Sequence, residues 1–497
     1  MKQAKSHFST GQLESDLKAR TIQGATATFV GQGLKFLLQI GSIMVLARLL
    51  TPDDFGLVAM VTAVTGFILI FKDLGLSMAT VQRAEIKHAQ VSTLFWINLA
   101  LSTILMLITL ALAPAIAWFY DDARLAKMAA VLSVAFILGG LTVQHQALLR
   151  RQMHFRTITL IDVSAMALGI LAAIVCAWVG LTYWSLVWMQ IVTALATAIG
   201  VWVASGWIPS LPTRRSGVRS MLKFGGYLSA YSFVNYFARN ADQILIGRFY
   251  GAGALGLYSR AFSILLFPIG QITAPMTAVA VPALSRLQDD PQRYRNYYLS
   301  AVKIIAYLSM PLVAFMGVVS EEIVYFVLGE NWLESSTIFT ALAFAAFWSP
   351  FASTTGWIFI SRGETRRMLQ CALVATPVRI IAFLIGIRWG VLGVAISYSI
   401  TITLQIIPQF WFALKNSPLS VWSVLAVVSK PFFLSLIVAG ASFYVHMRIA
   451  GNGYLESLAG TAFTAAISLI VLVLLVRPLR DDIVMLAAKA GLPLVRS

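Results

Sequence analysis

The sequence has little charge. Asp, Glu, Lys and Arg make up only 11% of its 497 residues, whereas a soluble domain carries roughly 25%. Apolar residues (AVILMFWYC) make up 59%, and the mean hydropathy is +0.81. So few charges cannot cover so much apolar surface in water, which excludes a soluble multidomain protein, a disordered chain and a collagen-like fibre. The composition predicts a polytopic integral membrane protein.

Cysteine is scarce, and sequence motifs of catalysis are absent. Cys176 and Cys371 lie far apart in apolar stretches, so we expect small interior side chains and no disulfide framework. The chain has no Gly-Lys pair, hence no Walker A motif, and no H-E-x-x-H, Cys cluster or G-x-S-x-G. GAGALG (251–256) matches a dinucleotide fingerprint by letter, but it follows an apolar span, so we interpret it as a tight hairpin. We expect no enzyme, no catalytic residue, no metal and no cofactor.

About fourteen apolar stretches are each near the roughly 20 residues that a helix needs to cross a bilayer. They are too long for barrel strands and lack period-two alternation, so an all-α fold is predicted. The predicted spans are 22–49, 55–80, 91–113, 125–149, 157–179, 183–205, 224–249, 254–282, 299–320, 336–360, 367–387, 391–413, 421–446 and 454–476.

Basic residues gather at both chain ends and in alternate loops, for example at Arg150, Arg151 and Arg366. The intervening loops are acidic, as at Asp122 and Glu334. Because cytoplasmic loops are the Lys/Arg-rich ones, both termini are predicted to be cytoplasmic, which requires an even number of spans. This asymmetry accounts for most of the formal net charge of +17, so no nucleic acid is expected as a partner.

An internal repeat predicts two lobes. VLARLLTPDDFGL (45–57) and LIGRFYGAGALGL (245–257) match without a gap at one arginine, one glycine and one leucine. Each forms the first hairpin of a six-span set, and both sets start on the same side, so the repeat is parallel with its axis along the membrane normal. The predicted division is an N-lobe 1–205, a cytoplasmic loop 206–223, a C-lobe 224–413, and two extra spans with a cytoplasmic tail 414–497.

Polar residues recur on one face of the first and seventh spans, at spacings of three and four. These residues are Thr28, Gln32, Lys35, Gln39 and Ser42 in the first, and Ser232, Asn235, Arg239 and Asp242 in the seventh. An offset of 200 superposes the two stripes, which predicts two lobes facing one central polar cavity. Hydrogen bonding between packed helices explains the amides and hydroxyls equally well, but it does not explain an unpaired Lys35.

Charged residues within the spans are costly, at roughly 2.5–3.5 kcal/mol each on insertion scales. The cations outnumber the anions, which favours an anionic passenger such as a phosphate, a diphosphate or a uronic acid. We predict that the cations bind substrate, that the amides line the cavity and that the carboxylates couple transport to an ion. These sets are Lys35, Arg239, Arg260 and Arg379; Gln32, Gln39 and Asn235; and Asp162 and Asp242.

The eighth span contains Pro268, Pro275 and Pro282, spaced by seven and therefore on nearly one face. Each removes a backbone donor and favours a kink. They predict a bent helix that hinges as the lobes rock, with a static kink as the alternative.

The stretch ARLLTPDDFGLVAMVTAVTGFILIFKDLGLSMATVQR (47–83) resembles the first hairpin of bacterial polysaccharide flippases. These are Wzx-type members of the multidrug/oligosaccharidyl-lipid/polysaccharide (MOP) superfamily, and the similarity is greatest to colanic-acid-type exporters. The R-x-L-x-P-x-x-F-G-L pattern, a later D-L-G-L, and two six-helix lobes plus two extra helices carry the resemblance. The residues that match as architectural positions are Arg48, Pro52, Phe55, Gly56 and Asp73.

The resemblance implies a bacterial inner-membrane protein that moves undecaprenyl-diphosphate-linked oligosaccharide repeat units to the periplasmic leaflet, for exopolysaccharide, capsule or O-antigen synthesis. It implies a cationic cavity for the diphosphate and sugars, while the lipid tail stays among the membrane lipids. Polysaccharide polymerase and chain-length machinery are further candidate partners. The coupling ion, a proton or sodium, is left open.

Three alternatives remain. A peptidoglycan-precursor flippase is close in chemistry. A cation-coupled drug exporter of the same superfamily usually takes cationic substrates, which a surplus of cations in the cavity disfavours. A membrane glycosyltransferase, polymerase or ligase is expected to place acidic or histidine residues in a sizeable external loop, and loop 321–335 offers only glutamates beside Trp332.

Overall fold

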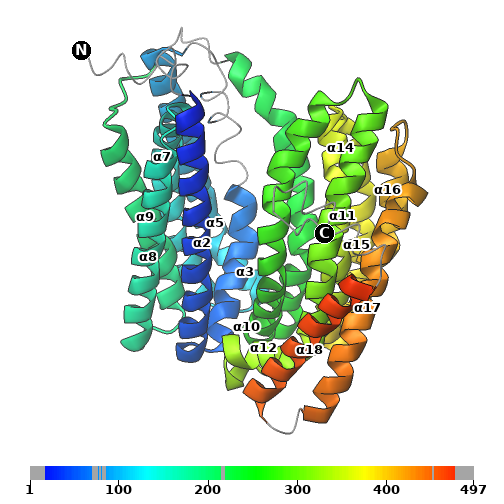
Figure 1. Ribbon diagram of the computed structural model, residues 1–497. Coiled ribbons are helices and arrows are strands. Elements are labelled where there is room, and N and C mark those ends of the chain that lie inside the picture. Colours follow the sequence, from blue (N-terminus) through cyan, green and yellow to red (C-terminus); the bar gives the residue numbers. More distant parts are fainter. Residues whose placement is uncertain are drawn as a thin grey trace. The chain divides into compact units, whose positions relative to one another are not determined.

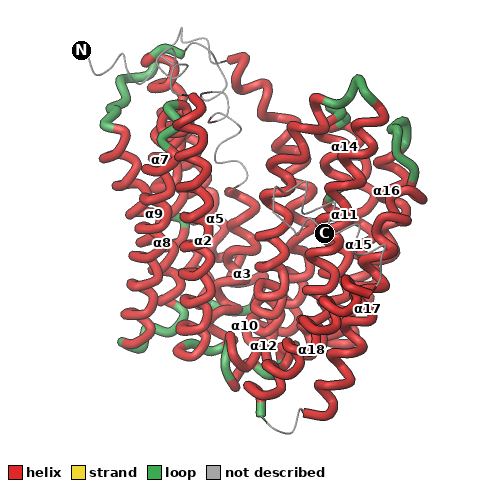
Figure 2. Tube along the Cα trace, viewed as in Figure 1, coloured by secondary structure: helices red, strands yellow, loops and turns green. Residues whose placement is uncertain are grey.

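The computed structural model describes residues 17–69, 77, 80, 86–213, 219–449 and 453–475. These residues are helical apart from short connections, and no strand occurs among them (Figure 2). The predicted all-α fold is confirmed. Asp73 of the family pattern lies outside the described residues.

The chain divides into two compact units, and the first is Met1–Gly256. Within it, α8 packs against α2 and α9, and α7 packs against α5 and α9. Its helices, seen in Figure 1, are α2 (Leu17–Leu49), α3 (Pro52–Leu69), α5 (His88–Tyr120), α6 (Arg124–Leu132), α7 (Val134–Arg151), α8 (Phe155–Trp178), α9 (Trp184–Ser205) and the first part of α10 (Arg219–Arg286).

The second unit is Leu257–Ser497. In this unit α11 packs against α13 and α17, α16 against α13 and α15, and α17 against α18. Its elements are the rest of α10, α11 (Pro291–Val318), α12 (Ser320–Val327), η2 (Glu330–Trp332), α13 (Ser335–Ser353), α14 (Thr355–Ser361), α15 (Thr365–Gly386), η3 (Ile387–Trp389), α16 (Gly390–Leu414), α17 (Val421–Ile449) and α18 (Tyr454–Leu475).

Eleven helices among the described residues are long and apolar enough to cross a membrane. Two of them, Arg239–Arg286 and Thr365–Leu414, have 48 and 50 residues, about twice what one crossing needs. The first breaks at Gly251 and the second at η3 and Gly390, so each holds two predicted spans. A further helix, α3, ends where the description stops. The helices are consistent with fourteen spans, and the chain is a multi-pass membrane protein.

The units divide at Gly256, whereas the predicted lobes are separated by the loop 206–223. The first part of α10 falls with the first unit because it packs there. The Tyr236 hydroxyl donates to the carbonyl oxygens of Thr62 and Ala63 on α3, at 3.0 and 2.8 Å. The lobe boundaries themselves stay a prediction.

The start of α3 is fixed by the segment Thr51-Pro52-Asp53-Asp54. The Asp54 carboxylate accepts hydrogen bonds from the Thr51 backbone N–H (2.9 Å) and hydroxyl (2.8 Å). Proline suits the first helical position, and carboxylates suit a helix N-terminus. This part of the family pattern therefore sets where the second membrane helix begins.

Gly56 and Gly256 allow two backbones to touch. A Cβ on Gly56 would lie 1.7 Å from the carbonyl oxygen of Ala252, and one on Gly256 would lie 1.9 Å from that of Pro52. The contacts are reciprocal, because Ala252 and Gly256 stand 200 positions after Pro52 and Gly56. Paired contacts of this kind arise between two copies related by a local two-fold axis.

A second pair of turns matches at a different offset. Between α7 and α8, Met153 has φ 58°, and between α14 and α15, Gly363 has φ 70°. The next residues, His154 and Glu364, each donate their N–H to a carbonyl five positions back, at 3.0 and 2.8 Å. Both turns are Schellman-type helix ends. They lie 210 positions apart, so the gapless offset of 200 holds for the first hairpin but not further along the chain.

Candidate functional site

Lys35 of α2 and Asp162 of α8 form an ion pair in the first unit, with Nζ 2.6 Å from Oδ2. Their side chains are 26% and 32% exposed, so the pair is half-buried and within reach of solvent. The expectation that Lys35 is unpaired is wrong, because the packing of α2 on α8 joins residues 127 positions apart. The predicted substrate-binding cation and the predicted ion-coupling carboxylate are therefore one local group.

The surroundings of this pair are polar on the α2 side. Gln32 and Gln39 are both exposed on α2 on either side of Lys35. The absence of a side chain at Gly31 lets α2 approach α8 closely, since a Cβ there would lie 1.9 Å from Cγ2 of Thr159. Close packing at one turn brings the next turn's Lys35 within hydrogen-bonding distance of Asp162.

The polar stripe predicted for the seventh span lies on α10, and it has both exposed and buried positions. Arg239 is exposed, whereas Asp242 is 2% exposed and its Oδ1 accepts from the Gln243 backbone N–H at 2.8 Å. Asn235 belongs to α10, but its side chain lies outside what the structure describes. Its proposed place in a polar cavity stays a prediction, as do the roles of Arg239 and Asp242.

Arg379 lies on α15 in the second unit and is half-buried. Its Nη2 donates to Oε1 of Gln405 at 3.3 Å, and its guanidinium lies 6.0 Å from the ring centroid of Tyr398. The Gln405 amide in turn donates to the carbonyl oxygen of Ala375 at 3.0 Å, which fixes the orientation of the amide. Two residues of α16 thus hold this cation in place.

Arg260 lies on the second part of α10 and is half-buried, and the same part of α10 makes an aromatic contact with α16. The rings of Phe262 and Tyr398 meet edge to face with centroids 5.6 Å apart, and Tyr398 also stacks on Phe383 of α15 at 5.9 Å. Tyr398, which contacts Arg379, therefore joins α10, α15 and α16. Aromatic and guanidinium groups together are suited to sugar rings and phosphates.

The three prolines of the predicted hinge lie inside α10, which continues to Arg286. Pro268 is half-buried and Pro275 and Pro282 are exposed. The one position recorded with non-helical backbone angles in the described helix is Gly251, with φ 79° and ψ −175°. The role of the prolines as a hinge stays a prediction.

A groove of about 570 Å³ runs between α13 and α16. Its hydroxyl groups all donate to backbone carbonyls, so their hydrogens are already used: those of Thr337, Thr340, Ser399 and Thr403. Exposed side chains such as Phe344 and Leu404 make up the rest of the lining. The groove is an apolar surface, unlike the Arg379 group.

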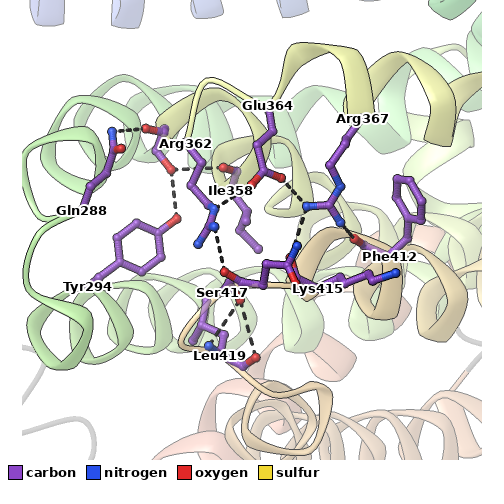
Figure 3. Close-up of polar contacts among 12 residues, drawn as sticks. Gln288, Tyr294, Ile358, Arg362, Glu364, Arg367, Phe412, Lys415, Ser417 and Leu419 are labelled. Atoms are coloured by element: carbon purple, nitrogen blue, oxygen red, sulfur yellow. Dashed lines mark hydrogen bonds and ion pairs between the residues drawn. The ribbon is translucent and has the colours of Figure 1, made fainter.

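A network of hydrogen bonds and ion pairs lies at the end of the second unit that the loop charges predict to be cytoplasmic (Figure 3). The Glu364 carboxylate lies between two arginines: Arg362 Nε donates to Oε1 at 3.0 Å, and Arg367 binds the other oxygen. The same arginines cap the end of α16, with Arg362 donating to the carbonyl of Asn416 at 2.7 Å and Arg367 to that of Lys415 at 3.1 Å. These two arginines therefore stabilise the end of α16 as well as contributing positive charge to a predicted cytoplasmic loop.

Sequence reasoning missed two such groups. Arg151 is only 5% exposed and donates to the carbonyl oxygen of Thr80 at 3.1 Å, although it reads as a simple loop cation. Glu322 is 3% exposed and faces His446, which stands in an apparently apolar span. Neither partner is close in sequence, so no local spacing could have revealed them.

The turn that the loop charges predict to be external, between α5 and α6, carries a shifted carboxyl group. Burial alone raises the pKa of Asp122, but the hydrogen bonds from the Arg124 side chain and backbone outweigh it and lower the pKa below its usual value. Arg124 also binds Asp53 at the start of α3 at 2.9 Å. Among the described residues no group of three or more His, Cys, Asp or Glu is placed to hold a metal ion.

Charged and amide groups set into long apolar helices define a multi-pass membrane protein with polar sites inside its spans. A family model described as "Polysaccharide biosynthesis protein" matches residues 45–337. This match covers more than half of the chain, so the chain belongs to that family.

Curated relatives align over most of their length. The teichuronic acid biosynthesis protein TuaB of Bacillus subtilis (strain 168) is 26% identical over 457 residues, 86% of this chain and 92% of the relative. The lipopolysaccharide biosynthesis protein WzxC of Escherichia coli (strain K12) is 24% identical over 451 residues, 88% of this chain and 89% of the relative. The succinoglycan biosynthesis transport protein ExoT of Rhizobium meliloti (strain 1021) is 23% identical and 92% of each chain is covered.

Solved structures with the same fold include the lipid II flippase MurJ in an inward closed conformation. It has a TM-score of 0.72 and 16% identity, covering 90% of this chain and 97% of MurJ. An inward-facing multidrug resistance MATE transporter of the MOP superfamily has a TM-score of 0.60 and 18% identity, covering 79% and 94%. At these sequence identities the structural similarity establishes the shared fold alone. The predicted membership of a polysaccharide biosynthesis family is thereby confirmed, and so is the predicted fold.

Proposed function

We propose that the chain is a flippase, and not an enzyme, that moves lipid-linked oligosaccharide repeat units across the bacterial inner membrane by alternating access. The substrate is an undecaprenyl-diphosphate-linked oligosaccharide used for surface polysaccharide, and both termini are cytoplasmic. Family membership, relatives named for polysaccharide biosynthesis and transport, and the fold support this proposal. Lys/Arg-rich loops support the orientation.

The half-buried Lys35–Asp162 pair is the observation on which the mechanism rests. An ion pair inside an apolar helix bundle is costly to desolvate, and its partial exposure leaves it open to exchange of partners. A diphosphate carries more charge and more acceptor oxygens than one carboxylate. We infer that the diphosphate displaces Asp162 from Lys35, and that Asp162 then takes up a proton or a sodium ion.

Arg379 supplies a second anion-binding group in the second unit. Gln405 and Tyr398 hold its guanidinium without neutralising its charge. A planar fork held in this way is suited to bidentate binding of phosphate, and the neighbouring rings are suited to sugars. Arg239 and Arg260 are proposed as further contacts of the same substrate.

The test is complementation of surface polysaccharide in a strain lacking the gene. We expect Lys35→Ala and Arg379→Ala to reduce export by about tenfold or more, the order expected for losing one charge-assisted contact, while membrane abundance is kept. Arg379→Lys should restore only part of the export, because an ammonium lacks the fork. The deletion strain should accumulate the lipid-linked repeat unit on its cytoplasmic side.

A double replacement separates binding from structure. If Lys35 only neutralises Asp162, then Lys35→Ala with Asp162→Ala removes both charges and should restore export. If the pair takes part in transport as proposed, through Lys35 or Asp162, the double variant stays inactive although it is as abundant as the parent protein. Full activity of Lys35→Ala and Arg379→Ala, or accumulation of a peptidoglycan precursor in the deletion strain, would contradict the proposal.

A further inference from the structure

A carboxylate is buried where α12 meets the hairpin of α17 and α18. Glu322 is 3% exposed, and its Oε1 accepts a hydrogen bond from the Ser457 hydroxyl of α18 and lies 3.2 Å from Nδ1 of His446 on α17. Its second oxygen, Oε2, has no hydrogen-bond partner among the described residues. None of the residues proposed for the substrate belongs to this group.

Among the described residues, no Lys or Arg forms an ion pair with the buried carboxylate. The ionisable groups on the elements around it are mostly acidic or phenolic: Glu321, Tyr325, Glu330, Tyr454 and Glu456. The one permanent cation nearby on α17, Arg448, is exposed and turned to the Tyr444 hydroxyl at 3.4 Å. An unpaired buried carboxylate is strongly unfavourable. The group therefore needs a proton, either on the carboxylate itself or on a base beside it.

His446 is placed to hold that proton. Its Nδ1 lies 3.1 Å from the Ser457 hydroxyl as well as 3.2 Å from Glu322. Because Ser457 donates its hydrogen to the carboxylate, Nδ1 must carry a hydrogen itself. An added proton therefore enters at Nε2 and makes the ring an imidazolium. The His446 side chain is 21% exposed while that of Glu322 is 4% exposed, so water reaches the ring before it reaches the carboxylate.

The same three residue types make up a hydrolytic triad, but the geometry differs. In a triad the carboxylate holds Nδ1 and the serine binds Nε2. Here the carboxylate and the serine share Nδ1, and the serine hydroxyl is donated to the carboxylate. Ser457 is thus held as a hydrogen-bond donor and not activated as a nucleophile.

Two buried hydroxyl groups without a hydrogen-bond partner among the described residues lie further along the interface between α17 and α18. The antiparallel register places His446 beside Ser457 and packs Ala465 against the cluster of Leu434 and Val438. Ser442 and Thr461 lie at the level between these contacts. Both are fully buried, and neither Ser442 Oγ nor Thr461 Oγ1 has a partner among the described residues. The Glu322 carboxylate therefore lies at one end of a row of buried polar groups between α17 and α18, and it is not an isolated surface contact.

We propose that Glu322, His446 and Ser457 form a proton-binding site at the outer end of the α17–α18 hairpin. One proton from the medium adds to the imidazole, and the resulting imidazolium–carboxylate pair ties α12 to the hairpin. Histidine is the side chain that normally changes charge between about pH 5 and about pH 8. Loss of the proton at higher pH leaves the carboxylate without a counter-charge and loosens α12.

The sign of the pH dependence follows from the proton count. In the proposed site the imidazolium–carboxylate pair is present only in the folded protein, so stability should fall as pH rises and the pair is lost. Purified protein in detergent should show a Tm that decreases from about pH 6 to about pH 9 in sodium-free choline buffer. Glu322→Gln should remove this contribution to the dependence of the Tm on pH. Glu321→Gln is the matched control, because Glu321 is exposed and accepts a hydrogen bond from the Tyr454 hydroxyl, and it should keep the slope.

A double-mutant comparison tests the pairing. His446→Gln should lower the Tm more in the parent protein than in the Glu322→Gln background, because only the parent then holds an uncompensated carboxylate. If Glu322→Gln does not fold, nitrogen NMR of the parent protein provides the second measurement. The chain has five histidines, so His446 is identified by its loss in His446→Gln, and it should carry two ring protons at about pH 6.

Two results would overturn the proposal. One is an unchanged Tm slope in Glu322→Gln together with a neutral His446 ring at about pH 6. The other is recovery of the Tm at high pH by sodium chloride, but not by choline chloride, in the parent protein and not in Glu322→Gln, which would make the site one for a metal cation. Neither result bears on the flippase proposal, whose test uses different residues and a different measurement.

Discussion

Placing Lys35 or Asp162 alone in an apolar helix costs free energy, and this cost is smaller when the two side chains form an ion pair. Each charge alone costs roughly 2.5–3.5 kcal/mol at mid-bilayer on insertion scales. Removing one member of such a pair leaves the other uncompensated, whereas removing both does not. Because the pair is about one-quarter to one-third exposed, water and an anionic ligand can compete for the lysine. The same contact therefore serves both folding and the proposed exchange of partners.

Arg124 is the centre of a second ion group, at the turn between α5 and α6. It binds Asp122 through Nη2 at 2.7 Å and Asp53 through Nη1 at 2.9 Å. Its side chain is 44% exposed, so solvent screens these contacts. We expect the group to contribute about 1 kcal/mol or less per pair. It fastens the start of α3 to the start of α6 in the first unit.

The lowered pKa of Asp122 predicts a pH effect. A carboxyl group with a lowered folded-state pKa contributes stability that is present above its unfolded pKa and is lost as pH falls through the folded value. Asp122→Asn should therefore lower the Tm at neutral pH, by an amount that corresponds to about 1 kcal/mol or less, and the difference from the parent protein should shrink as the pH falls through the folded-state pKa of Asp122. Thermal denaturation in detergent across this pH range measures it.

The control is Asp121→Asn. Asp121 is exposed and has φ 58°, a conformation that asparagine adopts readily, so this variant should keep the parent Tm. A Tm deficit in Asp122→Asn that is as large in acid as at neutral pH would show that the carboxylate charge is not what stabilises the turn.

At the scale of elements, the contact of α3 with α10 depends on two glycines. Gly256→Ala places a Cβ 1.9 Å from a backbone carbonyl oxygen, and Gly56→Ala places one at 1.7 Å. Backbone cannot rotate away as a side chain does, so the helices must separate. We expect either variant to lower folded yield severalfold and to reduce stability by about 1–3 kcal/mol or more, as overpacking does.

Gly253→Ala is the matched control for these variants. Gly253 lies in the same helix, three residues earlier, and a Cβ there meets nothing within 4 Å. Alanine favours a helix over glycine by about 1 kcal/mol, so Gly253→Ala should be neutral or stabilising. Fluorescence-detected size-exclusion chromatography and a Tm compare the variants. Equal behaviour of Gly256→Ala and Gly253→Ala would contradict the close backbone contact.

Helix positions were largely predictable from the sequence, because hydropathy acts residue by residue. The predicted span 391–413 falls within α16 (Gly390–Leu414), and 336–360 covers α13 and most of α14. Pairings between helices were not predictable in this way. Lys35 meets Asp162, and Glu364 meets the end of α16, through registers that no single helix specifies. Sequence spacing places a residue on a face of its helix but does not reveal the neighbouring helix.

At the scale of the whole molecule, the loop charges predict the orientation, and the structure shows where it can be tested. Arg151 is a poor labelling site although it lies in a basic loop, since it is 5% exposed and hydrogen-bonded to Thr80. Asp122 is tied to Arg124. Exposed neighbours are available on both sides: Ala123 and Glu334 in predicted external turns, and Arg156 and Arg366 in predicted cytoplasmic ones.

Cysteine labelling at these four positions tests the orientation once the native Cys176 and Cys371 are replaced. Ala123→Cys and Glu334→Cys should react with a membrane-impermeant maleimide in intact cells. Arg156→Cys and Arg366→Cys should react only after permeabilisation, because retention of positive loops on the cytoplasmic side sets the topology. Using two positions per side and one from each compact unit guards against a local re-entrant loop. External labelling of Arg156→Cys and Arg366→Cys together would reverse the orientation, and it would place the Glu322 site on the cytoplasmic side.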